Sequence, residues 1–270
     1  MKKVMSKDGT TIAFDQSGEG PVLILVGAAS VTRAEEASLV ASLAPRFTVF
    51  AYDRRARGDS GDTRPYAVER EVEDIEALIN EAGGSAFLFG HSSGAVLALE
   101  AARQLSGKVT KLAMYEPPFI VDDTHAPAPE GFARRLDELA AAGHQDEVVE
   151  NWMTFVGGAP AEAIAQMRQS PMWAHMESLA QSLAYDATIM DDTQTGTPAP
   201  LQKWASVAVP TLVMDGTMMM GREDLHVFMR HGADELARVL PNAQRRTLEG
   251  QDHGPADDVL AQALTAFFIG

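Results

Sequence analysis

The chain has 270 residues, enough for one large domain or for one domain that carries an inserted subdomain. Its hydrophobic content of 46% and charged content of 22% are those of an ordinary globular protein. The formal net charge of −16 repels phosphate backbones and anionic lipid surfaces, and the lack of cysteine excludes disulfides, a thiolate nucleophile and thiolate metal sites.

The first elements in chain order are two short strands, predicted at 2–6 and 10–16 around a turn-forming Lys-Asp-Gly. The apolar run VLILV at 22–26 predicts a central strand that is covered on both faces. Apolar residues at helical spacing predict a helix over 33–44, and a second buried strand follows at 47–53.

The same alternation of strands and helices continues to residue 116. An amphipathic helix is predicted at 68–84, a strand at 85–90, a helix at 93–105 and a strand at 109–116. Regular alternation of strands and helices is typical of a mostly parallel sheet with helices on both faces. We therefore predict an α/β fold.

This alternation of strands and helices stops after Pro117 and Pro118. From about 120 to 204 the sequence has helix-type stretches and no convincing strand. The alternation then resumes, and four further elements are predicted, a strand at 207–216, a helix at 224–240, a strand at 243–250 and a helix at 255–268.

We therefore predict a core domain made of residues 1–119 and 205–270, with a helical cap subdomain, residues 120–204, inserted between strands six and seven. No stretch approaches the ~20 apolar residues of a membrane span, and the first residues lack the apolar run of a signal peptide. We expect a cytoplasmic monomer or homodimer with a small-molecule substrate and with no nucleic-acid or membrane partner.

The sequence Gly90-His91-Ser92-Ser93-Gly94 lies where a predicted strand becomes a helix. Small neighbours are needed at a sharp strand-to-helix turn, which would hold Ser92 above the sheet as a nucleophile. The Ser93 N–H, at the start of the helix, could then bind a developing oxyanion. The plainer interpretation is a glycine-rich turn whose serine caps the helix; the setting favours the nucleophile.

A serine needs a base, and His253 is the histidine that best fits this role. It lies between the last strand and the closing helix, in a loop at the same sheet edge as Ser92. We expect His91 to point away from the site, and His226 and His231 are five residues apart, which is not a metal-ligand spacing on a helix.

Six motifs, in this order, make the chain resemble the α/β-hydrolase superfamily: VLILVGAAS, FAYDRRARGDSG, FLFGHSSGA, YEPPF, VPTLVMDG and GQDHG. The resemblance covers essentially the whole chain and implies an α/β-hydrolase fold with a helical cap. It also implies the chain order serine, acid, histidine, and a second oxyanion donor at the Ala28 backbone N–H.

The acid of the triad is less obvious, because the position where the family usually has it is Met219 here. Three substitutes are open. Glu116 follows the preceding strand, where some relatives, including certain haloalkane dehalogenases, have their acid; Asp215 ends its own strand; and Asp224, or Glu223 beside it, could reach back from a longer loop. We choose Glu116.

Large apolar residues in the insertion indicate an apolar pocket. We expect some of them to face the core as its roof, together with the methionine run at 218–220. The candidates are Trp152, Met153, Phe155, Met172, Trp173 and Met176.

The leading hypothesis is a serine hydrolase that cleaves an ester, lactone or thioester of a small, largely apolar compound through an acyl-serine intermediate. It implies no metal and no organic cofactor, and the serine argues against dehalogenase or epoxide hydrolase chemistry. The alternative keeps the pocket without hydrolysis, as a lyase, cyclase, isomerase or small-ligand binder.

Overall fold

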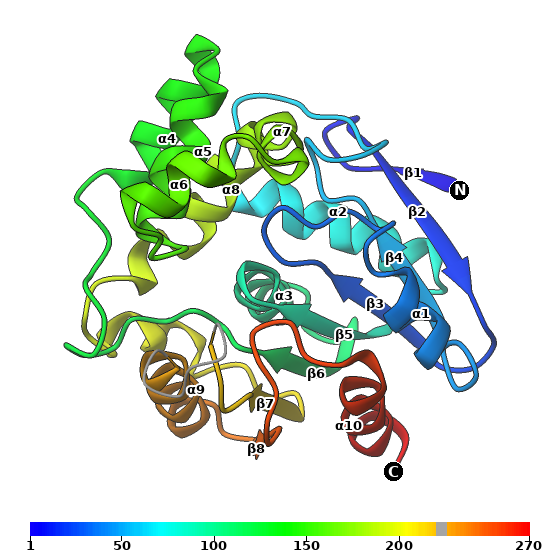
Figure 1. The fold of residues 1–270 in the computed structure, drawn as a ribbon. Helices are drawn as coiled ribbons and strands as arrows, with labels where there is room; N and C mark the ends of the chain where they lie inside the picture. Colours follow the sequence, from blue (N-terminus) through cyan, green and yellow to red (C-terminus); the bar gives the residue numbers. More distant parts are fainter. Residues whose placement is uncertain (220–225) are drawn as a thin grey trace.

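A single sheet runs through the computed structural model, which describes residues 1–219 and 226–270 (Figure 1). In this part of the chain its eight strands are β1 (Lys2–Met5), β2 (Thr11–Ser17), β3 (Val22–Val26), β4 (Thr48–Tyr52), β5 (Ala86–His91), β6 (Val109–Tyr115), β7 (Thr211–Asp215) and β8 (Ala243–Thr247). Their order is β1-β2-β4-β3-β5-β6-β7-β8. The first two strands are antiparallel to their neighbours and all later pairs are parallel.

Helices cover both faces of this sheet, as predicted. Those of the described residues are α1 (Ala37–Leu43), α2 (Val68–Glu81), α3 (Ser93–Gln104), α4 (Phe132–Ala142), α5 (Gln145–Phe155), α6 (Ala161–Met167), α7 (Pro171–Ser178), α8 (Ala180–Met190), α9 (Val227–Val239) and α10 (Asp257–Ile269). None of them is long and apolar enough to span a bilayer.

The two faces of the sheet belong to separate hydrophobic clusters, because successive side chains of a strand point to opposite faces. Leu23 and Leu25 of β3 lie in the cluster that α1 and α10 complete. Ile24 and Val26 lie in the larger cluster, to which α2, α3 and α9 contribute. β3 is therefore the doubly covered central strand that its apolar sequence predicts.

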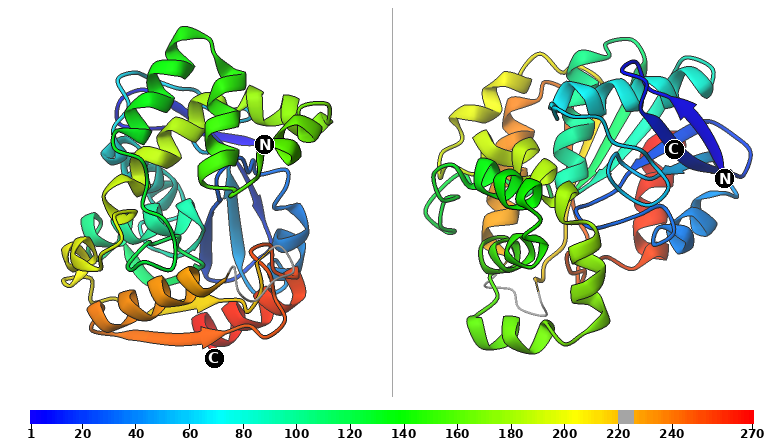
Figure 2. Two further views of the ribbon diagram at one scale, coloured as in Figure 1. Left: turned by 60° about the vertical axis from the view of Figure 1, so that its left-hand side comes forward. Right: turned by 90° about the horizontal axis from the view of Figure 1, so that it is seen from above.

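All the residues between β6 and β7 are described, and they contain helices but no strand. They form α4 to α8 and two short 3₁₀ helices, η1 (Asp191–Thr193) and η2 (Ala199–Trp204). The helices α4 to α8 gather above one end of the sheet, away from both termini (Figures 1 and 2). The division into a core and a cap subdomain at residues 120 and 204 stays a prediction.

One helix is shorter than expected. Turns occupy residues 33–36 and α1 begins only at Ala37. The reason lies in Arg33, whose backbone N–H donates to Asp53 Oδ1 at 2.9 Å and whose guanidinium pairs with Asp15 and Asp59. These contacts hold residue 33 against residues in or near β2 and β4, so the helix begins only after it. Of the helix expected at 224–240, residues 224 and 225 lie outside the described residues.

Candidate active site

Ser92 lies between the end of β5 and the start of α3, in a backbone conformation that few residues adopt. Its φ is 55° and its ψ −124°, and its N–H donates to the Tyr115 carbonyl at 3.0 Å. A Cβ on Gly90 would lie 2.5 Å from the Gly94 carbonyl oxygen, and one on Gly94 would lie 2.2 Å from that of Val26. Both glycines are therefore needed for α3 to approach the sheet so closely.

His253, in the loop between β8 and α10, lies beside Glu116. Its Nδ1 is 2.6 Å from Glu116 Oε2, across 137 residues of sequence. Ser92 and His253 line the same cavity. No hydrogen bond joins Ser92 Oγ to the His253 ring within the described residues, and in ligand-free sites such contacts are often long and tighten only around substrate.

Glu116 is buried, directly after β6, with a positive φ of 47°. Its N–H donates to the Met214 carbonyl at 2.9 Å, which fixes its position beside β7. Oε1 accepts the Gly216 N–H at 2.8 Å, while Oε2 faces His253. Burial by itself raises the pKa of Glu116, but the hydrogen bonds from two histidines and from the Gly216 N–H outweigh it and lower the pKa to about 2. Glu116 is thus an anion at neutral pH.

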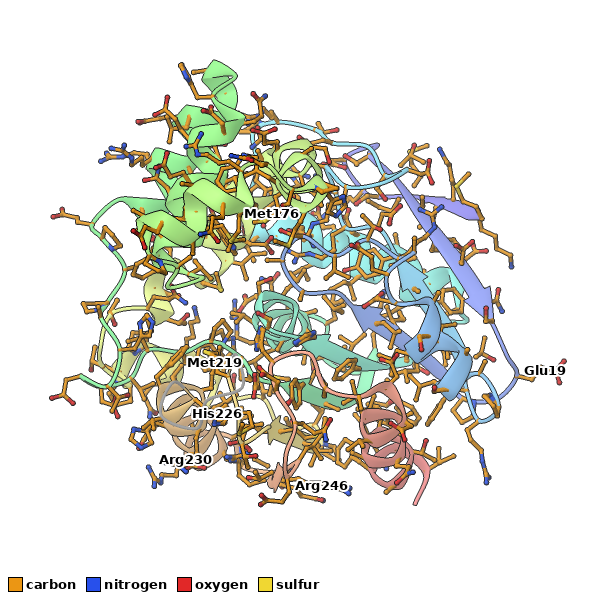
Figure 3. All side chains as sticks on the ribbon, viewed as in Figure 1. Glu19, Met176, Met219, His226, Arg230 and Arg246 are labelled. Atoms are coloured by element: carbon orange, nitrogen blue, oxygen red, sulfur yellow. The ribbon has the colours of Figure 1, made fainter. Side chains whose placement is uncertain are left out.

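The second of these histidines is His226, whose spacing from His231 excludes a metal-ligand pair on one helix and predicts no other role. Its Nε2 lies 2.8 Å from Glu116 Oε1, and the residue is 2% exposed. His231, on α9, is apart from this contact and bonds Asp122. Figure 3 shows His226 beside α9, beneath the cap helices. A histidine soon after β7, at the sheet edge that also carries Glu116, is the sequence signal that could have indicated it.

Asp215, the described alternative for the acid, has partners other than His253. Asp215 Oδ1 instead accepts hydrogen bonds from Arg245 at 3.1 Å and from Thr247 Oγ1 at 2.8 Å, on the β8 side. Asp224 and Glu223 lie outside the described residues. Met219, at the usual position of the acid, lines the cavity and packs against Phe228.

The two expected oxyanion donors lie at neighbouring turns. Ser93 begins α3, and in the described part of the chain neither its N–H nor that of Ala28 has an acceptor. The Gly27 carbonyl, which belongs to the same peptide unit as the Ala28 N–H, accepts from Arg54 Nη1 at 3.3 Å. Because a trans peptide points its C=O and N–H in opposite directions, this bond turns the Ala28 N–H away from Arg54.

Arg54 belongs to a buried charged network beneath the site. Asp186 of α8 accepts from Arg54 Nη1 at 2.7 Å and from Ser93 Oγ at 2.8 Å on Oδ1, and from Arg57 Nη2 at 2.6 Å on Oδ2. Arg57 also donates to the Ala28 carbonyl at 2.5 Å. The arginine-rich loop after β4 thereby connects helix α8 to the loop that carries Ala28.

The expectation that His91 points away from the site is wrong. His91 lines the cavity, and its ring centroid is 4.9 Å from that of His253. The buried Nε2 atom has no partner in the described structure. Burial, and then the neighbouring His253, lower the pKa of His91 to about 3, so this imidazole is neutral at physiological pH.

The cavity has a volume of about 350 Å³, near the lower end of the range for small-molecule sites. Among the described residues its wall contains no Asp, Glu, Lys or Arg side chain. Its apolar wall combines residues from between β6 and β7 with residues from other parts of the chain, and the larger ones are Ile120, Trp152, Phe155, Met219, Phe228 and Met229.

Of the insertion residues expected to roof a pocket, Trp152 and Phe155 do line the cavity. Trp173 and Met176 are buried in the large core cluster and Met153 packs against that cluster, while Met172 is exposed. From the methionine run, Met219 lines the cavity, and Met220 lies outside the described residues.

Comparison with known proteins points to one family. The model of the alpha/beta hydrolase family matches residues 22–264. The crystal structure of an alpha/beta hydrolase from Sphaerobacter thermophilus is 49% identical, with a TM-score of 0.86 over 99% of this chain and 100% of that one.

More distant structures share the fold alone. A thermophilic esterase from Thermogutta terrifontis is 21% identical, with a TM-score of 0.70 over 98% of this chain and 96% of that chain. An enol-lactonase from Burkholderia xenovorans is 17% identical, with a TM-score of 0.66 over 100% of both chains.

Proposed function

This chain belongs to the alpha/beta hydrolase family, and we propose that it is a serine hydrolase that cleaves an ester, lactone or thioester bond of a small, largely apolar compound. The observation that carries the proposal is the 2.6 Å contact between His253 Nδ1 and Glu116 Oε2. His253 lines the same apolar cavity as Ser92. An acid–imidazole pair next to a serine held at a strained turn is the arrangement that activates a hydroxyl nucleophile.

In the first half of the reaction, Ser92 Oγ attacks the carbonyl carbon of the substrate while His253 Nε2 takes its proton. The Nδ1–H of His253 donates to the Glu116 carboxylate, which fixes the tautomer and stabilises the imidazolium that forms. Because the pKa of Glu116 is about 2, the carboxylate remains ionised throughout. The Ala28 and Ser93 N–H groups stabilise the oxyanion.

The attack forms a tetrahedral intermediate that carries this oxyanion. Its collapse expels the alcohol or thiol, to which His253 returns the proton, and leaves an acyl group on Ser92. In the second half a water molecule attacks the acyl carbon as His253 takes its proton. The acid is then released from Ser92 Oγ, to which His253 returns the proton. The apolar wall around the site suits the hydrocarbon part of such a substrate.

The non-hydrolytic alternative was suggested by Met219, which stands at the position where the family usually has the acid of the triad. The contact of Glu116 with His253 supports hydrolysis instead, because it supplies the carboxylate that the base requires.

A fluorophosphonate probe tests the proposal, since it reacts only with an activated serine. We expect stoichiometric labelling of Ser92 in the wild-type protein and none in Ser92→Ala, together with hydrolysis of short acyl esters or lactones in a graded panel. Equal labelling of the wild type and of Ser92→Ala would show that the reactive group is elsewhere. Absence of both labelling and hydrolysis would favour the non-hydrolytic alternative.

A further inference from the structure

Gln194 is a polar residue in the otherwise largely apolar wall of the cavity. It follows η1 and is buried, with 6% of its surface exposed. Its backbone carbonyl accepts the Ala128 N–H at 2.8 Å, and the preceding carbonyl, of Thr193, accepts the Ile120 N–H at 3.1 Å. The backbone that carries this side chain is therefore held on both sides by the segment that follows β6.

The orientation of the Gln194 carboxamide follows from its partners. Nε2 donates to the Pro118 carbonyl at 2.9 Å and lies 3.9 Å from Met190 Sδ. A carbonyl oxygen can only accept, so the amide nitrogen has to be the atom on that side. Oε1 consequently points the other way, where no donor from the described residues reaches it. Oε1 is not sealed from solvent, and Gln194 lines the cavity.

His125 is a second polar residue that lines this cavity. Its Nδ1 lies 2.9 Å from the Ala126 carbonyl, which requires the proton to be on Nδ1. In the neutral ring Nε2 is then an acceptor, and the ring is held against Phe228 with their centroids 4.4 Å apart. Both Gln194 and His125 thus offer a lone pair to a ligand, and neither offers a free N–H in this form.

An acceptor in an apolar cavity loses its hydrogen bond to water when a ligand fills the space. A ligand without a donor leaves that acceptor unpaired, and the loss of binding free energy is larger than the hydrogen bond itself contributes. A ligand with a donor restores the hydrogen bond. A scissile ester or lactone group has no donor of its own.

From these contacts we propose that Gln194 Oε1 is a specificity determinant, and that the preferred substrate carries a hydroxyl or amide N–H outside its scissile group. This inference rests on the proposed hydrolysis and narrows its substrate class to neutral, largely apolar compounds with such a donor. His125 is the auxiliary acceptor for the same polar group.

The test uses 4-nitrophenyl esters of straight-chain acids, in three series matched for length and ending in hydroxyl, methyl or methoxy. Because the hydroxyl series places its donor at graded distances from the carbonyl, one length should reach Gln194. We expect kcat/KM for that ester to exceed those of its methyl and methoxy partners by about tenfold or more. The methoxy series separates donation from polarity, since its oxygen can only accept.

The decisive variant is Gln194→Met, which keeps the length of the side chain and removes the acceptor. We expect it to bring the hydroxyl-to-methyl ratio close to one. Gln166→Met is the matched control, because Gln166 is exposed on α6 and does not line the cavity; its ratio should equal that of the wild type. If Gln194 only braced the cap against Pro118, Gln194→Met would lower all three series equally, and the proposal would be overturned.

A binding measurement keeps this inference separate from the hydrolysis itself. Calorimetry on Ser92→Ala with alkanols and with alkyl methyl ethers of matched length, which carry no donor, reports the preference for a donor without any turnover. An alkanol preference that Gln194→Met abolishes supports the inference even if no ester is cleaved. Equal affinities at every chain length would contradict it, whether or not the protein proves to be a hydrolase.

Discussion

His226 Nε2 lies 2.8 Å from Oε1 of Glu116, on the side of the carboxylate opposite His253. The carboxylate is therefore held between two imidazoles, with the Gly216 N–H as a third donor. This arrangement leaves Oε2 directed at His253 and restricts rotation of the Glu116 side chain, which is longer than the aspartate that many triads use. His226 acts through Glu116 and not on the substrate, so its expected role is positioning.

Replacement of His226 by phenylalanine should lower kcat by roughly 10–100-fold, the rate equivalent of a lost hydrogen bond to a charged group. His226→Gln, which keeps an N–H donor, should recover part of that loss, and KM should change little in both variants. His231→Gln, on the helix that begins directly after His226, is the control, and its kcat should be unchanged. A wild-type kcat in His226→Phe, with only its thermal stability reduced, would limit His226 to a structural role.

Ser92→Ala should abolish ester hydrolysis, with a loss in kcat on the order of 10⁴–10⁶. The melting temperature should remain nearly unchanged, because Ser92 Oγ forms no hydrogen bond within the described residues. Steady-state kinetics and thermal melting of this variant beside Ser42→Ala, an exposed serine of α1, measure both effects. Retention of half the activity in Ser92→Ala would mean that another group is the nucleophile.

His253→Ala should be nearly as damaging, since base and nucleophile act in one proton-transfer step. The double variant, Ser92→Ala with His253→Ala, should be about as slow as either single one. Rates of the three variants with one ester give the comparison. If the two losses multiplied, Ser92 and His253 would act in separate steps.

Asp186→Asn should lower the free energy of unfolding by about 3–5 kcal/mol, because it leaves the buried guanidinium groups of Arg54 and Arg57 short of a counter-charge. Urea denaturation measures this effect. Asp191 is exposed and directly follows α8, the helix that carries Asp186. The free energy of unfolding of Asp191→Asn should stay within about 0.5 kcal/mol of that of the wild type. A loss below about 1 kcal/mol in Asp186→Asn would mean that Glu71, the other carboxylate on Arg54, suffices for the network.

The strands and the sharp turn at Ser92 could be predicted from the sequence because their signals are local. An apolar run such as 22–26 indicates a covered strand by itself, and Gly90 and Gly94 indicate the close approach that a Cβ would prevent. The sequence indicates Glu116 as the acid only by elimination among the carboxylates that follow strands at one sheet edge.

The remaining contacts depend on tertiary placement that no local pattern encodes. Arg54 meets Asp186 across 132 residues, and Glu116 meets His226 across 110. Likewise, the role of Gln194 follows from the Pro118 carbonyl opposite its amide, and a glutamine in a polar stretch of sequence gives no sign of such a partner.

Glu116→Gln is the prediction that tests the choice of acid. It should lower kcat by roughly 10²–10⁴ with a modest change in KM, because an amide accepts the His253 N–H weakly and does not stabilise the imidazolium. Asp215→Asn is the control, since Asp215 is equally buried but bonds Arg245 and Thr247; its kcat per folded molecule should be nearly that of the wild type. A larger loss in Asp215→Asn than in Glu116→Gln would reverse the assignment.

The same variant has a signature in the pH dependence of stability. The pKa of Glu116 is about 2 in the folded protein and about 4.3 for glutamate in an unfolded chain, so the unfolded state takes up the proton first as the pH falls. The stabilisation from ionised Glu116 is therefore complete above about pH 5 and is lost as the pH falls toward 2. Urea denaturation of the wild type and Glu116→Gln between pH 6 and 3 should show the wild type losing stability more steeply below about pH 4.5, because glutamine binds no proton. Parallel curves for the two proteins would mean that Glu116 is not held as an anion by His253 and His226, and the kinetic loss would then need a cause other than a missing carboxylate.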